Sequence, residues 1–158
     1  MTQDQKTSTD APTQEIELLS FYVGDHEYSV DIMSVREIRG WTKTTSLPHS
    51  PQYVQGVINL RGTVLPVVDL ALRLGLSAKE PDERNVVVVV DLDSRTLGLR
   101  VDAVSDILSI STNALQDPPQ MSADEEDSFV RALTIVDERM VRVLDLKSVL
   151  PSMDEAAA

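Results

Sequence analysis

Two charged side chains near a predicted turn could carry recognition chemistry in this sequence. Arg61 and Gly62 separate two apolar segments, 56–60 and 63–68, and Glu37 precedes them. An arginine on a rigid, glycine-flanked turn next to apolar side chains could bind a partner helix or loop, because arginine is enriched at interface hot spots. An exposed Glu37–Arg61 salt bridge, worth at most ~1 kcal/mol, accounts for the same residues equally well. The residues alone leave both interpretations open.

The two histidines, His26 and His49, are the candidates for acid–base catalysis. His26 lies in the turn-like sequence GDHE, and His49 lies between prolines in LPHSP. The sequence contains no Gly-x-Ser-x-Gly nucleophile motif, no glycine-rich phosphate-binding motif and no cysteine, which excludes thiol catalysis and cysteine-based metal sites. We interpret both histidines as surface loop residues and expect no enzymatic activity, with a small hydrolase as an alternative.

Two acidic segments are candidate cation sites. DLDSR at 91–95 resembles the start of a calcium loop but lacks its later glycine and its terminal glutamate, so a polar hairpin turn is favoured. SADEED at 122–127 fits a solvated linker in which Ser122 and Glu125 could cap a helix. The single tryptophan, Trp41, is interpreted as a packing residue. The sequence therefore predicts neither a metal nor a cofactor.

The charge balance limits the partners. Lys and Arg total 14 against 26 Asp and Glu, a formal charge of −12, and aromatic residues make up only 4%. A nucleic-acid-binding barrel, which needs a basic stripe with interleaved aromatics, is therefore a remote alternative. The longest apolar run, 86–90, is far too short to span a membrane, and the N-terminal residues lack the apolar core of a signal peptide. We expect a cytoplasmic protein without direct membrane insertion.

The chain divides into short strand-like segments between polar breaks. Residues 1–14 are predicted to be a flexible tail, and 151–158 a C-terminal tail. Alternating apolar residues predict strands over 16–23 and 28–32, and the segments flanking Arg61-Gly62 predict a hairpin. Pro66 lacks an N–H group, so it indicates an edge or an irregularity in the second hairpin strand. Asp69 is a natural N-cap for a short helix that ends near Gly75.

The second half repeats this order. A shift of 69 residues aligns 28–38 with 97–107, and a shift of 76 residues aligns 57–70 with 133–146, so that Asp69-Leu70 falls on Asp145-Leu146. The repeat is too long for a solenoid, and it predicts a mainly β fold of two similar five-stranded barrels with a few short helices. We place the first barrel at about 15–80 and the second at about 85–150, packed through apolar faces.

Three segments carry a resemblance to a known family: VREIRG at 35–40, VQGVINLRGTVLPVVDL at 54–70 and LGLRVDAVSDIL at 97–108. Together they resemble the CheW-like domains of chemotaxis coupling proteins, over a single domain of about 15–150. The same domain occurs at the C-terminus of the CheA histidine kinase and the N-terminus of CheV proteins. Because no room remains here for a kinase core or a receiver domain, a stand-alone coupling protein is the expected match.

The resemblance implies a fold and two partners. The fold would be two intertwined five-stranded SH3-like β-barrels that share a hydrophobic interface. The partners would be the cytoplasmic tip of methyl-accepting chemotaxis receptors and the CheW-like regulatory domain of CheA, met in receptor arrays on the inner face of the membrane. The protein would then be a non-enzymatic adaptor that places kinase activity under receptor control. A CheW-like scaffold that serves a different sensory kinase pathway is the alternative.

The resemblance also implies the site residues. A receptor groove between the barrels would be lined by Val35, Glu37, Gly56, Asn59, Arg61, Val86, Val87, Val104 and Ile107, with the last four as an apolar floor from the second barrel. Kinase docking would involve Ile32 and Gly98. Simple core packing explains Val86 and Val104 nearly as well, because valine in a strand is normally buried.

Overall fold

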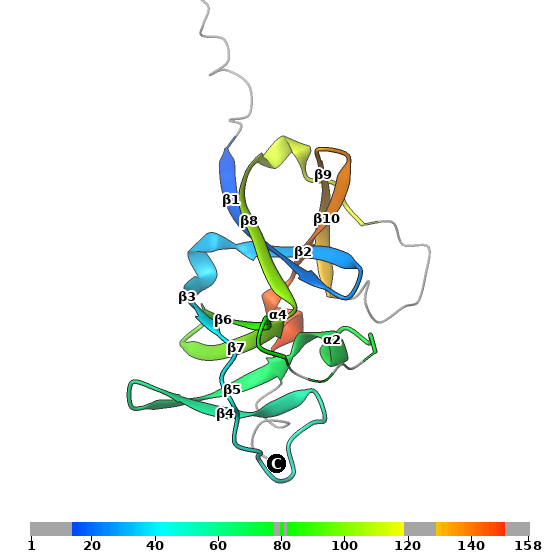
Figure 1. Cartoon of the computed structure of the whole chain (residues 1–158). Helices are drawn as coiled ribbons and strands as arrows, with labels where there is room; N and C mark the ends of the chain where they lie inside the picture. Colours follow the sequence, from blue (N-terminus) through cyan, green and yellow to red (C-terminus); the bar gives the residue numbers. More distant parts are fainter. Residues whose placement is uncertain (1–13, 78–79, 81, 119–128, 151–158) are drawn as a thin grey trace, which may run out of the picture.

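Ten strands form two five-stranded sheets in the computed structural model, which describes residues 14–77, 80, 82–118 and 129–150 (Figure 1). Sheet A has the strand order β8 (Ala103–Ser111), β1 (Glu15–Val23), β2 (His26–Asp31), β10 (Arg139–Leu144) and β9 (Val130–Val136). Sheet B has the order β3 (Val35–Gly40), β6 (Val86–Leu92), β7 (Arg95–Val101), β5 (Thr63–Asp69) and β4 (Val54–Leu60). The short helical elements are η1 (Ile32–Ser34), α2 (Leu70–Arg73), η2 (Thr112–Ala114) and α4 (Leu146–Val149). The predicted fold class is confirmed.

The predicted boundary between the barrels is wrong. Sheet B is one continuous stretch of chain, residues 35–101, whereas sheet A is assembled from 15–31, 103–111 and 130–144. The chain crosses from sheet A to sheet B after β2 and returns before β8, so a division at 80–85 separates strands that pair with each other. Local hydrophobic patterns specify strands and turns, but they do not specify which sheet a strand joins.

The internal repeat is present in the strand pairing itself. Parallel pairing aligns Val67 of β5 with Gly98 of β7, and it aligns Val143 of β10 with Ser29 of β2. These two pairs are related by the 76- and 69-residue shifts seen in the sequence. The edge strands also carry matching bulges, because Arg36 in β3 and Ser105 in β8 are both skipped in the register. The repeat therefore reflects two copies of one local structure.

Both sheets contribute the same face to the central core. The central cluster includes sequence-equivalent pairs from the two copies: Leu19 and Val88, Phe21 and Val90, Tyr28 and Leu97, Val30 and Leu99, Val68 and Leu144, and Leu70 and Leu146. Because equivalent surfaces meet, the contact is isologous, and the sheets are related by a pseudo-two-fold axis. Each sheet also encloses a smaller apolar cluster of its own, which gives it the interior of a small barrel.

Local features follow the sequence closely. The side chain of Asp69 accepts a hydrogen bond from the N–H of Leu72 at 3.4 Å and caps α2, as predicted, and Gly75 follows the helix with a φ of 82°. Pro66 lies in an interior strand. The ladder between β5 and β7 begins only at Val67, so the N–H group that Pro66 lacks is not needed for it.

The segment 91–95 forms a tight hairpin turn, with Asp93 and Ser94 in left-handed conformations, as favoured over a calcium loop. The 122–127 segment and both predicted tails, apart from Gln14, lie outside the described residues.

Arg73 fastens the two barrels to each other at one side of the core. Its guanidinium lies over the rings of Tyr53 and Phe129, at 4.1 and 5.1 Å from their centroids. It also donates to the carbonyl oxygens of Val149 at 2.9 Å and Ser148 at 3.1 Å, at the end of α4. The Arg73 side chain, which belongs to α2 after β5 of sheet B, therefore satisfies carbonyl groups of α4, which follows β10 of sheet A.

Replacing Arg73 with methionine should destabilise the fold. The variant keeps the apolar stem but loses the cation–π contacts and leaves partly buried carbonyl groups without a donor, so we expect a loss of about 2 kcal/mol. Urea unfolding measures this loss. The control is Arg84→Met, whose side chain is 89% exposed and whose replacement should stay within about 0.5 kcal/mol. Equal stability of the two variants would contradict the fastening role.

Candidate functional site

The Glu37–Arg61 pair closes the gap between the two edges of sheet B. β3 and β4 are the outermost strands of this sheet. The Arg61 guanidinium donates from Nη1 to Oε1 of Glu37 at 3.2 Å and from Nη2 to Oε2 at 3.3 Å. The Nη1 atom of Arg39 lies 3.9 Å from the same carboxylate. The Arg61 side chain is 64% exposed, so the pair contributes at most ~1 kcal/mol to stability.

The turn that carries Arg61 is held in a demanding backbone conformation. Arg61 and Gly62 have φ values of 52° and 87°, as in the type I′ turns whose twist matches antiparallel strands. The side-chain oxygen of Asn59 accepts a hydrogen bond from the Gly62 N–H at 2.9 Å. A left-handed arginine costs roughly 1–2 kcal/mol. The turn conformation of the backbone and the hydrogen bonds to Glu37 together hold the Arg61 guanidinium at a defined place on the surface.

The edge strands β3 and β8 of the two sheets carry equivalent apolar residues. Val35 of β3 and Val104 of β8 are partly buried and pack against the central cluster from the two sheets. Ile38 and Ile107, three residues further along these edge strands, are 46% and 54% exposed. The edge strands thus extend the apolar face of the central core onto the surface, and the sequence-predicted Val35, Val104 and Ile107 belong to this surface.

Several predicted site residues have other environments. Val87 is fully buried inside sheet B, and Gly98 is buried beside it, where an added Cβ would lie 2.6 Å from Cγ1 of Val87. Neither residue lies on the surface, because Val87 points into the barrel interior and Gly98 makes room for it. Val86 is partly buried and, like Val87, belongs to the same sheet as Glu37. The expectation that 86 and 87 form a floor from the other barrel is therefore wrong.

Gly56 and Ile32 have structural environments as well. Gly56 has a φ of 156°, and an added Cβ would lie 2.5 Å from the carbonyl oxygen of Thr45. This close approach permits the bridge between Thr45 and Val57. Ile32 is partly buried against the central cluster, while its neighbour Met33 is 87% exposed. Met33, not Ile32, offers the accessible apolar side chain at η1.

The site residues predicted from the sequence include only one of the exposed large apolar residues, Ile107, and they omit Tyr22, Met33, Ile38, Leu47, Val64, Ile135 and Met140. Ile135 and Met140 face each other across β9 and β10, and the repeat shift of 76 relates them to Asn59 and Val64, which pair across β4 and β5. The equivalence of Ile38 and Ile107 was visible in the sequence repeat, and it was the signal that could have placed Ile38 in the site.

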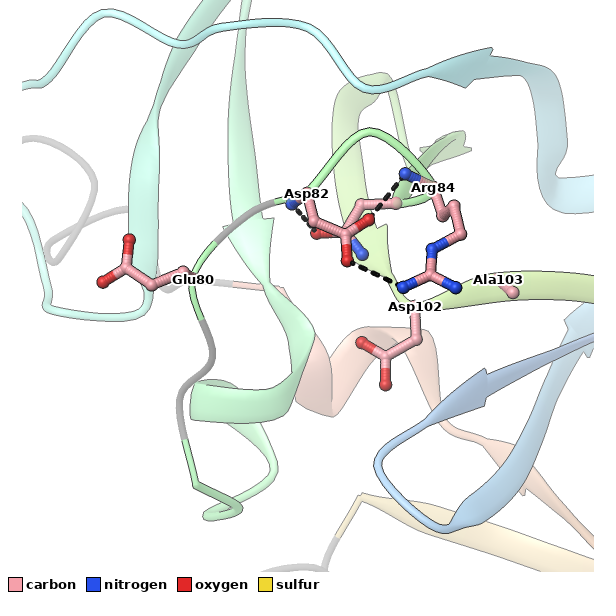
Figure 2. A pocket seen from close by; sticks show the side chains of 6 residues that line it. Glu80, Asp82, Arg84, Asp102 and Ala103 are labelled. Atoms are coloured by element: carbon pink, nitrogen blue, oxygen red, sulfur yellow. Dashed lines mark hydrogen bonds and ion pairs between the residues drawn. The ribbon is translucent and has the colours of Figure 1, made fainter.

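A cavity of ≈ 290 Å³ lies between residues 82–85 and the start of β8 (Figure 2). Its described lining consists of Glu80, Asp82, Arg84, Asn85, Asp102 and Ala103. The carboxylate of Asp82 accepts a hydrogen bond from the backbone N–H of Arg84 at 2.6 Å and lies 3.6 Å from its guanidinium. These contacts organise the loop itself, and the described lining offers no histidine, serine or threonine that could act as a base or nucleophile.

His26, one of the two candidate catalytic residues, lines a cavity together with Asp25, Ser77 and Asp102. The Nδ1 atom of His26 lies 3.5 Å from the hydroxyl of Tyr28, and His49 is exposed on a loop with a φ of 64°. Trp41 is partly buried, with the Arg100 guanidinium 6.0 Å from its ring centroid, as expected of a packing residue. Within the described ranges, no three His, Asp or Glu side chains are grouped so as to hold a metal ion, and no helix is long and apolar enough to cross a membrane.

The interlocked five-stranded sheets, with charged and apolar side chains exposed on their edge strands, define a double-barrel β protein. The chain belongs to the family of CheW-like domains, whose family model matches residues 17–154. It is 52% identical to the chemotaxis protein CheW of Rhizobium meliloti and 47% identical to the probable chemotaxis protein CheW of Rhizobium etli, each over 90% of this chain and 92% of the relative. The solved scaffolding protein TtCheW from Thermoanaerobacter tengcongensis superposes with a TM-score of 0.81 at 26% identity, over 89% of this chain and 95% of that chain.

Gly56→Ala should impair folding rather than produce a selective defect in binding. The added methyl group would meet a backbone oxygen in a conformation unfavourable for alanine, so we expect a loss of roughly 2–3 kcal/mol. Gly40→Ala is the matched control, because a methyl group added there would meet no atom within 4 Å beyond its chain neighbours and its effect should stay below about 0.5 kcal/mol. Thermal and urea unfolding compare the two. A fully stable Gly56→Ala protein would contradict the steric role of this glycine.

Proposed function

We propose that this protein is a non-enzymatic chemotaxis adaptor that couples methyl-accepting receptors to the CheA histidine kinase. Membership of the CheW-like family supports the proposal, together with relatives named as chemotaxis proteins and a structural neighbour titled as a scaffolding protein. The observation that carries it is the exposed Arg61, held in place by its turn and by Glu37, together with the exposed apolar residues on the edge strands of both sheets. The site of action would be the cytoplasm, at receptor arrays on the inner face of the membrane.

The receptor tip would lie along the surface formed by β3, β8 and the Arg61 turn. Receptor tips are helical hairpins, and an amphipathic helix can place its apolar face along an apolar groove. Val35, Ile38, Val104 and Ile107 would contact this apolar face. Arg61, with Glu37 and Asn59 holding it in place, would supply the charged contact at the rim, where its guanidinium can bind a carboxylate in a fixed geometry.

The kinase would use a separate surface. Ile32 and Met33 lie at η1, on the connection from sheet A to sheet B, and the exposed Met33 can adapt to an apolar partner. Binding of the CheW-like domain of CheA at this surface, with a receptor at the other, would make the adaptor bivalent. Two modest interfaces then reinforce each other through effective concentration within an array. Receptor control of the kinase would follow from this simultaneous contact.

Arg61→Ala and Glu37→Ala should each weaken binding to a receptor-tip fragment while unfolding remains cooperative. Loss of a hot-spot arginine typically costs more than about 1.4 kcal/mol, so we expect at least a roughly tenfold rise in Kd for Arg61→Ala. Arg61→Lys should restore only part of the affinity, because lysine lacks the planar guanidinium. Isothermal titration calorimetry provides the affinities, and Arg84→Ala is the exposed control.

The proposal fails if the unmodified protein does not bind receptor-tip fragments and does not make CheA activity responsive to receptors in reconstituted membranes. Binding to an unrelated sensory kinase alone would favour a CheW-like scaffold of another pathway. If the Arg61 and Glu37 variants lose folding without a separate binding defect, the ion pair has a structural role. Loss of a measured hydrolytic activity on replacement of His26 and His49 would favour an enzyme.

A further inference from the structure

The pseudo-two-fold axis places two equivalent regions on opposite sides of the same face. A two-fold rotation leaves the height of a point along its axis unchanged, so Glu37 and its equivalent Asp106 lie at the same height. The equivalence extends to backbone detail, because both positions follow a bulge, after Arg36 in β3 and after Ser105 in β8. A helix that lies across the axis therefore passes from one region to the other.

The apolar part of this face is symmetric. Val35 corresponds to Val104, and both pack against the central cluster. Ile38 corresponds to Ile107, and both are about half exposed. A helix that contacts these residues would find nearly the same apolar surface in either of two opposite directions, so the apolar contacts alone give it no defined direction.

The charges on the same face are not symmetric. Sheet B carries Arg39 and Arg61 near the carboxylate of Glu37, which accepts hydrogen bonds from Arg61, and Arg36 on the same strand pairs with Asp91. The equivalent positions of sheet A are Ser105, Leu108, Asp137 and Asp106.

The sign of the charge differs between the two sheets most clearly at the turn positions. Asp137 and Glu138 have φ values of 51° and 70°, matching Arg61 and Gly62 at the same turn. Asp106, Asp137 and Glu138 are all exposed. Where sheet B has the carboxylate–cation pair Glu37–Arg61, the equivalent positions of sheet A are the carboxylates Asp106 and Asp137, and the nearby Arg139 pairs with Glu27 instead.

We propose that this charge reversal sets the direction of the receptor helix across the two barrels. The proposal rests on the receptor-binding function and adds the charge pattern of the partner: an acidic flank lies at the Arg61 end, and a basic flank at the Asp106–Asp137 end. A lysine or arginine of the partner would supply at sheet A the cation that Arg61 supplies within sheet B. The net charge of −12 disfavours a second copy of the chain as occupant, because long-range repulsion opposes its approach.

The absence of cysteine permits a direct test of direction. Single Lys43→Cys and Ala114→Cys variants place a spin label at an exposed position beyond β3 and beyond β8, respectively. The probe is an isotope-labelled receptor-tip fragment with an acidic and a basic flank. We expect the Lys43→Cys label to broaden signals of the acidic flank, and the Ala114→Cys label to broaden those of the basic flank. Equal broadening of both flanks by each label would overturn the proposal.

Two further arms separate direction from binding. In Asp106→Asn/Asp137→Asn, we expect both flanks to be broadened by each label, because the directional preference of about tenfold is lost. A fragment whose acidic and basic flanks are exchanged should bind the unchanged protein in the opposite direction, and this arm requires no variant that could misfold. Retention of one direction in both arms overturns the inference. If the unchanged protein binds no fragment, the proposed receptor function has failed instead.

Discussion

The contact between equivalent apolar faces of the two sheets is the interaction on which the rest of the molecule depends. Each barrel encloses only a small cluster of its own, and small separate cores supply little stability. The central cluster therefore does more than join two domains, since it completes the burial of both. It also fixes the pseudo-two-fold relation, and with it the places where the edge strands emerge onto the surface.

The surface around Arg61 follows from this arrangement. The apolar faces that meet in the core continue into the exposed Ile38 and Ile107, because β3 and β8 are edge strands whose outer side has no neighbouring strand in the described sheets. The same local structure then carries opposite charge at the two turns. A shared backbone with different side chains explains how a repeated fold can have a surface that differs from end to end.

Sequence reasoning succeeded where the cause of structure is local. Alternation predicted the strands, the Arg61-Gly62 pair predicted a turn, and Asp69 predicted a cap, because each depends on neighbouring residues alone. The repeat shifts proved to relate equivalent strand pairings, because they convert the pair Val67 and Gly98 into the pair Val143 and Ser29. Membership of the family was readable for the same reason, as its motif surrounds one turn.

The errors concern long-range geometry. The run Val86–Val90 is apolar at every position, so its pattern does not reveal that Val87 and Val89 face the small interior while Val88 and Val90 face the central core. Gly98 looked available as a contact because its role, making room for Val87, depends on a strand pairing that no local pattern specifies. The wrong barrel boundary at 80–85 has the same cause, because the pairing of strands on either side of it is not specified by any local pattern.

The continuity of sheet B gives the two barrels different positions in the order of synthesis. Every strand of sheet B is present once residue 101 has left the ribosome, whereas sheet A gains its last strand only at residues 139–144. During that interval sheet B can form while the face that it turns toward the core has no complete partner. The nascent chain thus passes through a stage in which this apolar sheet is open to solvent, to chaperones or to another nascent copy, and the final third of the chain ends that exposure.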